Sequence, residues 1–416
     1  MKREHAPLKS LDQALAELMA FAVPLKGSVQ LDTFDADGRV LAQDLVSELH
    51  VPPQDNSSMD GYALRCVDVA SVGGRLTVTQ RIPAGTSGVP VEPGSAARIF
   101  TGAPIPPGAD AVVMQEDCEV LSAPHDAAVH EQVRILVLPQ PGQWIRRAGE
   151  DVARGAVVLH RGTRLSPAEL GLAASIGLDQ LPVLRTPRVA LFSTGDELVM
   201  PGTILPQQMK AGAIYNSNRY FLRALLKRLG CEVSDYGIVP DQREATEQAM
   251  RAASLGHDLI LTSGGVSVGE EDHVKAAVQA LGELNLWQIA IKPGKPFAYG
   301  RVGQAHVIGL PGNPVSSFVT FWLLVRPFLL KLQGVGSIVP FTQSLPAHFQ
   351  WTRADTRREF LRVRRNEAGG LDLFANQSSG VLTSAVWGDG LVDNPPGQRI
   401  AHGDCVEFIS FAELLA

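Results

Sequence analysis

The chain has 416 residues, of which 45% are hydrophobic, so it can bury a large core and form roughly two to four domains. Its net charge of −6, from 37 basic and 43 acidic residues, argues against general attraction to nucleic acid or to anionic membranes. The four cysteines form no CxxC pair, which argues against a zinc ribbon or a disulfide framework and favours the reducing cytoplasm.

The first predicted element is a helix. The N-terminus contains no apolar signal-peptide core, and Ser10 to Gln13 form a capping box that begins an amphipathic helix extending to about Phe21. Residues 51–142 then contain short β-prone runs separated by proline and glycine, which predicts an inserted β module.

A second capping box follows this module. Ser166 and Glu169 begin a helix that Gly177 ends. We expect this helix to pack against the N-terminal one, so that residues 1–50 and 143–182 form one discontinuous domain of helical and mixed structure.

From residue 183 to 333 the pattern predicts a doubly wound, mostly parallel α/β domain. Strand-like runs alternate with amphipathic helices, the pattern of a parallel sheet covered on both faces. The strands are expected at 188–193, 232–239, 258–262 and 305–310, and the helices at 218–229, 242–253, after 272 and at 315–330. The apolar stretch within the last helix, 318–330, is too short to span a membrane.

After residue 334 the chain returns to short β-prone runs. These lie at 359–363, 371–374 and 405–409, and they predict a C-terminal β-barrel-like domain over 334–416.

The segment from Thr262 to Asp272 carries the strongest chemical signal. It follows a buried strand, and at the carboxyl end of such a strand the amides of Gly264 and Gly265 and the hydroxyls of Ser263 and Ser267 suit a phosphate. Its acidic end, which includes Asp272, suggests that Mg²⁺ accompanies the anion. The alternative is a solvated helix start whose acids favour the helix dipole.

Two further acids follow strands of the same predicted sheet. Glu197 follows the first strand and Asp241 follows the second, so both are expected at the edge where the Gly264–Gly265 turn lies. Asp241 also forms an N-cap box with Glu244, which is a purely structural alternative. Glu197, Asp241 and Asp272 are therefore the candidate Mg²⁺ ligands.

A positively charged loop is the counterpart of these acids. Lys292 and Lys295 lie three residues apart between prolines, which predicts a stiff loop suited to a phosphate or oxometalate dianion. The alternative is an ordinary solvated loop. The sequence contains no P-loop, no GxGxxG fingerprint and no HExxH motif. Their absence argues against a P-loop NTPase, a dinucleotide-dependent dehydrogenase and a zinc protease.

Six motifs together resemble one family, the molybdopterin molybdenumtransferases, which include MoeA and the E domain of gephyrin. They occur in the family's order at 56–63, 101–104, 193–198, 262–269, 291–297 and 310–314. The resemblance implies insertion of molybdate into adenylylated molybdopterin, with Mg²⁺-dependent release of AMP. It also implies a homodimer of four-domain subunits, a separate adenylyltransferase as a partner, and molybdoenzymes that accept the product.

The resemblance also marks individual residues as the site. They are Asp60, Thr101, Glu197, Asp241, Asp272, Lys292, Lys295, Pro311, Arg362 and Ser379. One departure is Gln288, which stands where some members carry a lysine. Two rival functions stay open: a molybdopterin adenylyltransferase, which would not need the terminal domains, and a non-enzymatic scaffold of the gephyrin type.

Overall fold

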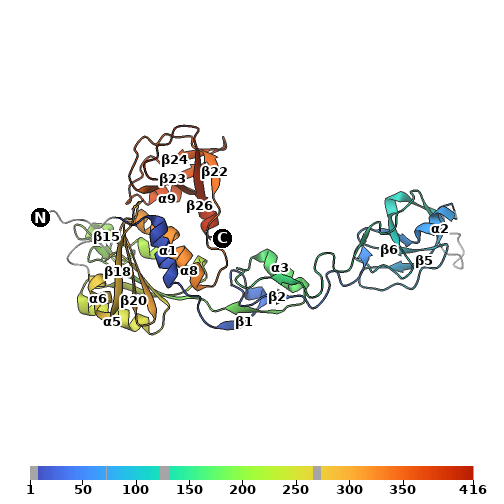
Figure 1. Cartoon of the computed structure of the whole chain (residues 1–416), viewed down its shortest axis with the longest axis horizontal. Helices are drawn as coiled ribbons and strands as arrows, with labels where there is room; N and C mark the ends of the chain where they lie inside the picture. Colours follow the sequence, from blue (N-terminus) through green and yellow to red (C-terminus); the bar gives the residue numbers. More distant parts are fainter. Residues whose placement is uncertain (1–7, 72, 122–130, 266–272, 416) are drawn as a thin grey trace.

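The computed structural model describes residues 8–71, 73–121, 131–265 and 273–415. The molecule is elongated (Figure 1). An α/β domain and the C-terminal β domain lie side by side at one end, a small domain containing β1, β2 and α3 lies in the middle, and the inserted β module lies at the opposite end.

The α/β domain is built on a six-stranded sheet of order β16-β13-β17-β21-β20-β18. The strands β16, β13, β17 and β21 pair in parallel. β20 pairs antiparallel with β21, and β18 pairs antiparallel with β20. The predicted strands are confirmed as β13 Arg188–Thr194, β16 Glu232–Val239, β17 Leu259–Ser263 and β21 Ala305–Leu310. The antiparallel edge, formed by β18 Gly282–Gln288 and β20 Pro296–Val302, was not predicted. β20 begins at a proline and contains Gly300, and both residue types are uncommon inside strands.

Helices cover both faces of this sheet. One face carries α5 Arg243–Ser254 and α6 His273–Leu281, whose buried residues share a core with Ile260 and Val307. The other face carries α4 Asn218–Arg228 and a long helix from Pro314 to Leu332. The predicted doubly wound arrangement is therefore confirmed.

The long helix changes character in its middle. It consists of α7 Pro314–Thr320, a π-helical segment Phe321–Val325 and α8 Arg326–Leu332. Pro327 explains the change, because it lacks the N–H that an α-helix would use and its ring crowds the carbonyl four residues earlier. This helix is long and apolar enough to cross a membrane, but 83% of its most apolar window is buried within the fold, as in a core helix.

The position of the first helix corrects one expectation. α1 Leu11–Phe21 packs on the α/β domain and not against α3 Pro167–Ser175. Leu11, Ala14 and Leu18 are buried in the α/β core, and the Phe21 ring stacks on Tyr299 with centroids 4.5 Å apart. The apolar face of α1 is thus buried by the larger core rather than by the nine-residue α3.

The middle domain has its own small core. It pairs β1 Ser28–Asp32 with β12 Gln180–Leu184 and β2 Leu45–Val46 with β11 Val157–Leu159, beside α3 and the short helix η1 Thr33–Asp35. A ladder of β3 Asn56–Ser57 and β10 Ile145–Arg146 leads from it to the β module.

The β module is a six-stranded sheet of order β7-β4-β6-β5-β9-β8. Its strands are β4 Gly61–Leu64, β5 Arg75–Ile82, β6 Ser95–Ile99, β7 Ala111–Met114, β8 Cys118–Leu121 and β9 Gln132–Ile135, with helices α2 Cys66–Ser71 and η2 Gln115–Asp117. Apolar side chains pack on both faces of this sheet, so the module has a core separate from the other domains.

The C-terminal domain contains a sheet of order β19-β23-β25-β26-β22, with β24 paired to β23. A bridge between Ala347 and Leu371 connects the end of β22 to β24, so the sheet closes on itself as the barrel-like prediction requires. Its elements are β22 Gln343–Pro346, β23 Arg358–Arg365, β24 Leu371–Leu373, α9 Thr383–Trp387, β25 Gly390–Asn394, β26 Cys405–Ser410 and α10 Phe411–Leu415.

An ion pair anchors the connection between the middle and α/β domains. Arg185 donates to both oxygens of Asp258, at 2.8 and 2.7 Å, and the backbone N–H of Arg188 donates to Asp258 at 2.9 Å. Burial alone would raise the pKa of Asp258, but the hydrogen bonds from Arg185 and Arg188 outweigh it and lower that pKa.

We predict that Asp258→Asn lowers the free energy of unfolding by about 1.5–3 kcal/mol at neutral pH, the range for hydrogen bonds to charged groups. Because the folded pKa of Asp258 is depressed, this stabilisation is present above the unfolded value of about 3.9 and is lost as the pH falls through the folded pKa. Urea unfolding at several pH values measures it. A difference between wild type and variant that grows on acidification would contradict the assignment.

Candidate functional site

The carboxyl ends of the parallel strands form the first part of the site. A cavity of about 540 Å³ opens at this edge of the sheet, and we call it the rim cavity. The described residues that line it include the predicted Glu197, Ser263, Gly264 and Pro311, and also Thr194, Leu198, Ile214, Tyr215, Asn216, Ser217, Asn218, Pro296, Gly312, Asn313, Pro314, Ser316 and Gly380. β14 Leu198–Val199 and β15 Ile214–Tyr215 pair beside it, and η3 Pro206–Gln208 lies between them in sequence.

The Gly264–Gly265 turn brings the backbone close to its neighbours. Both residues have positive φ, +92° and +67°, and a Cβ on Gly264 would lie 2.9 Å from the carbonyl oxygen of Thr194. Glycine is required there because other residues would be strained and crowded. Gly265 directly follows the cavity lining, whereas Ser267 lies outside the described residues.

Asn218 joins the two strand-end turns of the rim cavity, although it belongs to none of the motifs seen in the sequence. Its buried side-chain amide donates to the Ser263 hydroxyl at 2.8 Å and to the Gly312 carbonyl at 2.7 Å. Two further buried donors, Thr194 Oγ1 and Asn216 Nδ2, have no hydrogen-bond partner within the described part of the chain. The cavity therefore offers polar groups that suit an anionic ligand.

Two of the three carboxylates predicted to bind Mg²⁺ lie in the described residues. Glu197 is exposed, lines the rim cavity and folds back over Gly195, where a Cβ would lie 2.5–2.8 Å from its carboxylate. Asp241 follows β16, the parallel neighbour of β13. Asp272 lies outside the described residues, and those residues contain no group of three His, Cys, Asp or Glu side chains placed to hold a metal.

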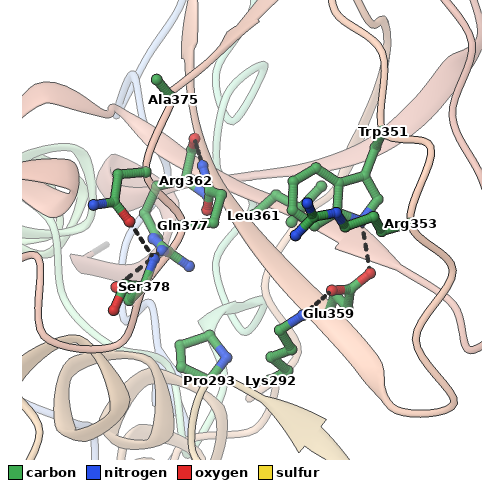
Figure 2. A pocket seen from close by; sticks show the side chains of 11 residues that line it. Lys292, Pro293, Trp351, Arg353, Glu359, Leu361, Arg362, Ala375, Gln377 and Ser378 are labelled. Carbon is green, nitrogen blue, oxygen red and sulfur yellow. Dashed lines mark hydrogen bonds and ion pairs between the residues drawn. The ribbon is translucent and has the colours of Figure 1, made fainter.

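A second cavity, of about 450 Å³, lies between the lysine loop and the C-terminal domain, and we call it the lysine cavity (Figure 2). It is lined by Lys292, Pro293, Trp351, Arg353, Glu359, Leu361, Arg362, Ala375, Asn376, Gln377 and Ser378. The structure thus brings the predicted Lys292 and Arg362 together, although they are 70 residues apart in sequence.

Lys292 is held by two acids that the sequence analysis did not single out. Its ammonium lies 2.9 Å from Glu359 Oε1 and 3.3 Å from Asp355 Oδ2. The Glu359 side chain is only 2% exposed, and its second oxygen accepts from the Trp351 indole at 2.7 Å. Hydrogen bonds from Arg357, and then from Lys292, hold the pKa of Asp355 well below its usual range, so that carboxylate stays ionised.

Arg362 forms the opposite side of the lysine cavity. It is buried, and it donates to the Phe360 carbonyl at 3.0 Å and to the hydroxyl of Ser384 at 3.2 Å, both uncharged acceptors. Burial lowers its pKa to about 10, so the guanidinium stays charged at neutral pH. Gln377 fixes its backbone by bonding both the N–H and the carbonyl of Arg362, at 2.9 and 3.0 Å.

The remaining two predicted residues of this region lie outside the lysine cavity lining. Lys295 is exposed, and its carbonyl accepts from the N–H of Ile289 at 2.8 Å. The hydroxyl of Ser379 accepts from Asn313 Nδ2 at 3.2 Å, and its carbonyl accepts from the N–H of Val315 at 2.9 Å. Segment 376–380 therefore separates the two cavities, because its first residues line the lysine cavity and Gly380 lines the rim cavity.

Asp60 and Thr101 form one unit in the β module. The N–H and the hydroxyl of Thr101 both donate to Asp60 Oδ1 at 2.8 Å, and these bonds lower the pKa of Asp60. Both side chains are exposed. The module lies at the far end of the molecule from the rim and lysine cavities (Figure 1), so within one chain these residues are not part of either cavity.

Comparison with known proteins identifies the chain's relatives. Three family profiles match it in order: the MoeA N-terminal region, domains I and II, over residues 9–177, a probable molybdopterin binding domain over 190–331, and the MoeA C-terminal region, domain IV, over 344–411. Molybdopterin molybdenumtransferase 2 of Mycobacterium tuberculosis is 36% identical over 395 residues, covering 92% of this chain and 94% of its own. The chain belongs to the molybdopterin molybdenumtransferase family.

Other members of the family are similar over shorter or longer stretches. The molybdopterin molybdenumtransferase of Haemophilus influenzae is 44% identical over 327 residues, 78% of each chain. Two crystal structures of molybdopterin biosynthesis MoeA protein from Pyrococcus horikoshii cover 97% of this chain and 99% and 100% of their own, with TM-scores of 0.77 and 0.83 at 31% and 28% identity. The four-part organisation of this chain is thus that of MoeA.

In this family member the shape of the lysine loop depends on Gly294. Gly294 has φ +116°, and a Cβ on it would lie 2.4 Å from the hydroxyl of Thr320. We predict that Gly294→Ala lowers the free energy of unfolding by about 1–3 kcal/mol more than Gly303→Ala does, because overpacking adds to the backbone strain. Gly303 is a matched control, since it also has positive φ, +60°, but its Cβ would meet nothing closer than 3.9 Å. Equal losses in urea unfolding would show that Thr320 does not restrict the loop.

Proposed function

We propose that this protein inserts molybdate into adenylylated molybdopterin, with Mg²⁺-dependent release of AMP, to give molybdenum cofactor. The observation that carries the proposal is the adjacency of two unlike cavities divided by residues 376–380: one at the ends of the parallel strands, and one lined by cationic side chains. The names of the relatives, which match 78% and 92% of the chain, favour this transferase over an adenylyltransferase or a scaffold.

In this proposal the rim cavity takes the phosphate-bearing part of the pterin substrate. The Ser263 hydroxyl, which accepts from Asn218 and keeps its own hydrogen, and the Thr194 hydroxyl, which is unpartnered among the described residues, offer donors for phosphate oxygens. Pro311 lines the same cavity. The N–H of Gly264 is not one of these donors, because it donates to the Leu310 carbonyl at 3.1 Å. Transfer of this kind requires orientation and stabilisation of charge on oxygen, so no side-chain nucleophile is needed.

Magnesium is proposed at this edge on the chemistry of its carboxylates, of which Glu197 is among the described residues that line the rim cavity and Asp241 is not. Glu197 and Asp241 are the described carboxylates that would hold it, with Asp272 as a further candidate, and Mg²⁺ is commonly bound through one or two carboxylates together with substrate phosphate. Bound there, the ion would neutralise developing negative charge on the phosphate.

The lysine cavity is proposed as the molybdate site. Molybdate is a tetrahedral dianion, and Lys292 and Arg362 present charged donors to the same space. Lys295 is kept as a candidate in the exposed part of the lysine loop. Ser379 is assigned to the wall between the two cavities, because Ser378 before it lines the lysine cavity and Gly380 after it lines the rim cavity.

The position of Asp60 and Thr101 supports a homodimer. Both residues belong to the β module, which lies at the opposite end of the molecule from the domains that form the cavities (Figure 1), so a second subunit must supply them if they act on the same substrate. We further propose that the protein works in the cytoplasm, receives its substrate from a molybdopterin adenylyltransferase and passes the product to molybdoenzymes.

The direct test incubates the purified protein with adenylylated molybdopterin, molybdate and Mg²⁺. We expect AMP to be released only when molybdate is present, and Glu197→Gln to raise the Mg²⁺ concentration needed for half-maximal release by about tenfold, equivalent to 1.4 kcal/mol. Asp196→Asn is the control, because Asp196 is also exposed but does not line the rim cavity. AMP release without molybdate would overturn the proposed function, and identical Mg²⁺ dependence in both variants would overturn the role of Glu197.

Mixed dimers test the shared site. We predict that Asp60→Ala and Glu197→Ala subunits, assayed at a Mg²⁺ concentration at which each is inactive alone, recover about a quarter of wild-type activity after random mixing, or about half in purified heterodimers, since one of the two sites then contains only intact residues. Differently tagged subunits allow the heterodimers to be isolated. An absence of recovery in verified heterodimers would place Asp60 and Glu197 of each site in the same chain.

A further inference from the structure

The charges that line the lysine cavity are unequally compensated. Lys292 lies between Glu359 and Asp355, two acids within 3.3 Å of its ammonium. Arg357, the other cation of this cluster, pairs with Asp355 at 2.9 Å. The charge of Lys292 is therefore largely balanced before any ligand arrives, although its position is well fixed.

The two arginines that line the cavity are different. The guanidinium of Arg362 bonds only uncharged acceptors, namely the Phe360 carbonyl, the Ser384 hydroxyl and the Ser378 carbonyl. Arg353 makes no hydrogen bond or ion pair with any residue in the described ranges, and it is exposed at the cavity wall. Both cations thus lack a counter-charge within the described chain.

The two arginines face the cavity from different sides. Figure 2 shows Arg362 and Ser378 on one side of the cavity and Arg353, Trp351 and Glu359 on the other, with Lys292 between them. Arg362 belongs to β23, whereas Arg353 lies in the loop that precedes it. A tetrahedral dianion between them would meet a rigid buried guanidinium on one side and a movable one on the other.

We propose that Arg353 is a further binding residue of the oxyanion site, and that it closes on a bound tetrahedral dianion opposite Arg362. The inference rests on the proposed function, because it takes the lysine cavity as the site of molybdate. A planar guanidinium with several N–H donors can contact two oxygens of such an anion at once, which an ammonium cannot do in the same way. In this arrangement Glu359 acts as a positioning residue for Lys292, while Arg353 and Arg362 supply the uncompensated charge.

The test is binding of molybdate alone to the full-length protein, measured by equilibrium dialysis without pterin. We expect Arg353→Gln to weaken binding about tenfold and Arg353→Lys to weaken it less, since charge-assisted bonds are worth more than neutral ones. Arg399→Gln is the matched control: Arg399 is an exposed arginine of the same domain, does not line the cavity and forms no hydrogen bond or ion pair within the described chain. The Arg399→Gln variant should have a dissociation constant for molybdate within about twofold of the wild-type value.

Competition by sulfate and by tungstate shows whether Arg353 contributes to the binding of tetrahedral dianions in general. We expect Arg353→Gln to weaken the binding of both competitors as much as it weakens the binding of molybdate. Because Arg353 is exposed, its variants should unfold at the wild-type temperature, so a loss of binding is not a loss of folding. Equal binding by Arg353→Gln and Arg399→Gln would overturn the role of Arg353 alone. Failure of the wild-type protein to bind molybdate would overturn the oxyanion site itself, and the proposed function would then be judged separately by AMP release.

Discussion

The pairing of β19 Ile291–Lys292 with β23 is the contact on which the candidate site depends. Ile291 pairs with Arg358 and Lys292 with Glu359 in a parallel register, so the loop that leaves the α/β sheet also becomes an edge strand of the C-terminal sheet. The same register places the Lys292 ammonium against the buried Glu359 carboxylate. One short strand therefore connects the two domains and orients a charged side chain.

The surrounding contacts hold this strand from several directions. Lys9 bridges to Ile289, with its N–H donating to the Gln288 carbonyl and its carbonyl accepting from the Ala290 N–H at 2.7 Å. Arg358 pairs with both Asp393 of the C-terminal sheet and Asp12 of α1. A buried carboxylate such as Glu359 is costly unless its oxygens are satisfied, and here Lys292 and the Trp351 indole satisfy both. Through the contacts of Lys9 and Asp12, the N-terminal segment and α1 contribute to the geometry of a site that they do not line.

The sequence was informative wherever one local rule decided the outcome. Capping boxes located α1 and α3, and strand–helix alternation located the parallel sheet and its ligand-binding edge, because periodicity and caps are local properties. The contacts of Lys292 with Asp355 and Glu359, and the separation of Ser379 from the lysine cavity, could not be predicted, because they depend on how two domains meet. The same reason explains the error about α1, whose apolar face could have been buried by either of two cores. Asn218 and Arg353 belong to no local pattern at all.

The two-stranded ladder β3–β10 has a mechanical consequence for the β module. The module is inserted in the chain, so both of its connections pass through this narrow ladder and the neighbouring bridge between Val51 and Val152. The ladder is bonded to the loop that carries Thr101, because the N–H of Gly102 donates to the Ser57 carbonyl at 2.8 Å and the N–H of Ser57 donates to the Ala103 carbonyl at 2.9 Å. The Asp60–Thr101 pair therefore lies beside the point where the chain enters the module, and a substitution in the ladder would act directly on the position of that pair.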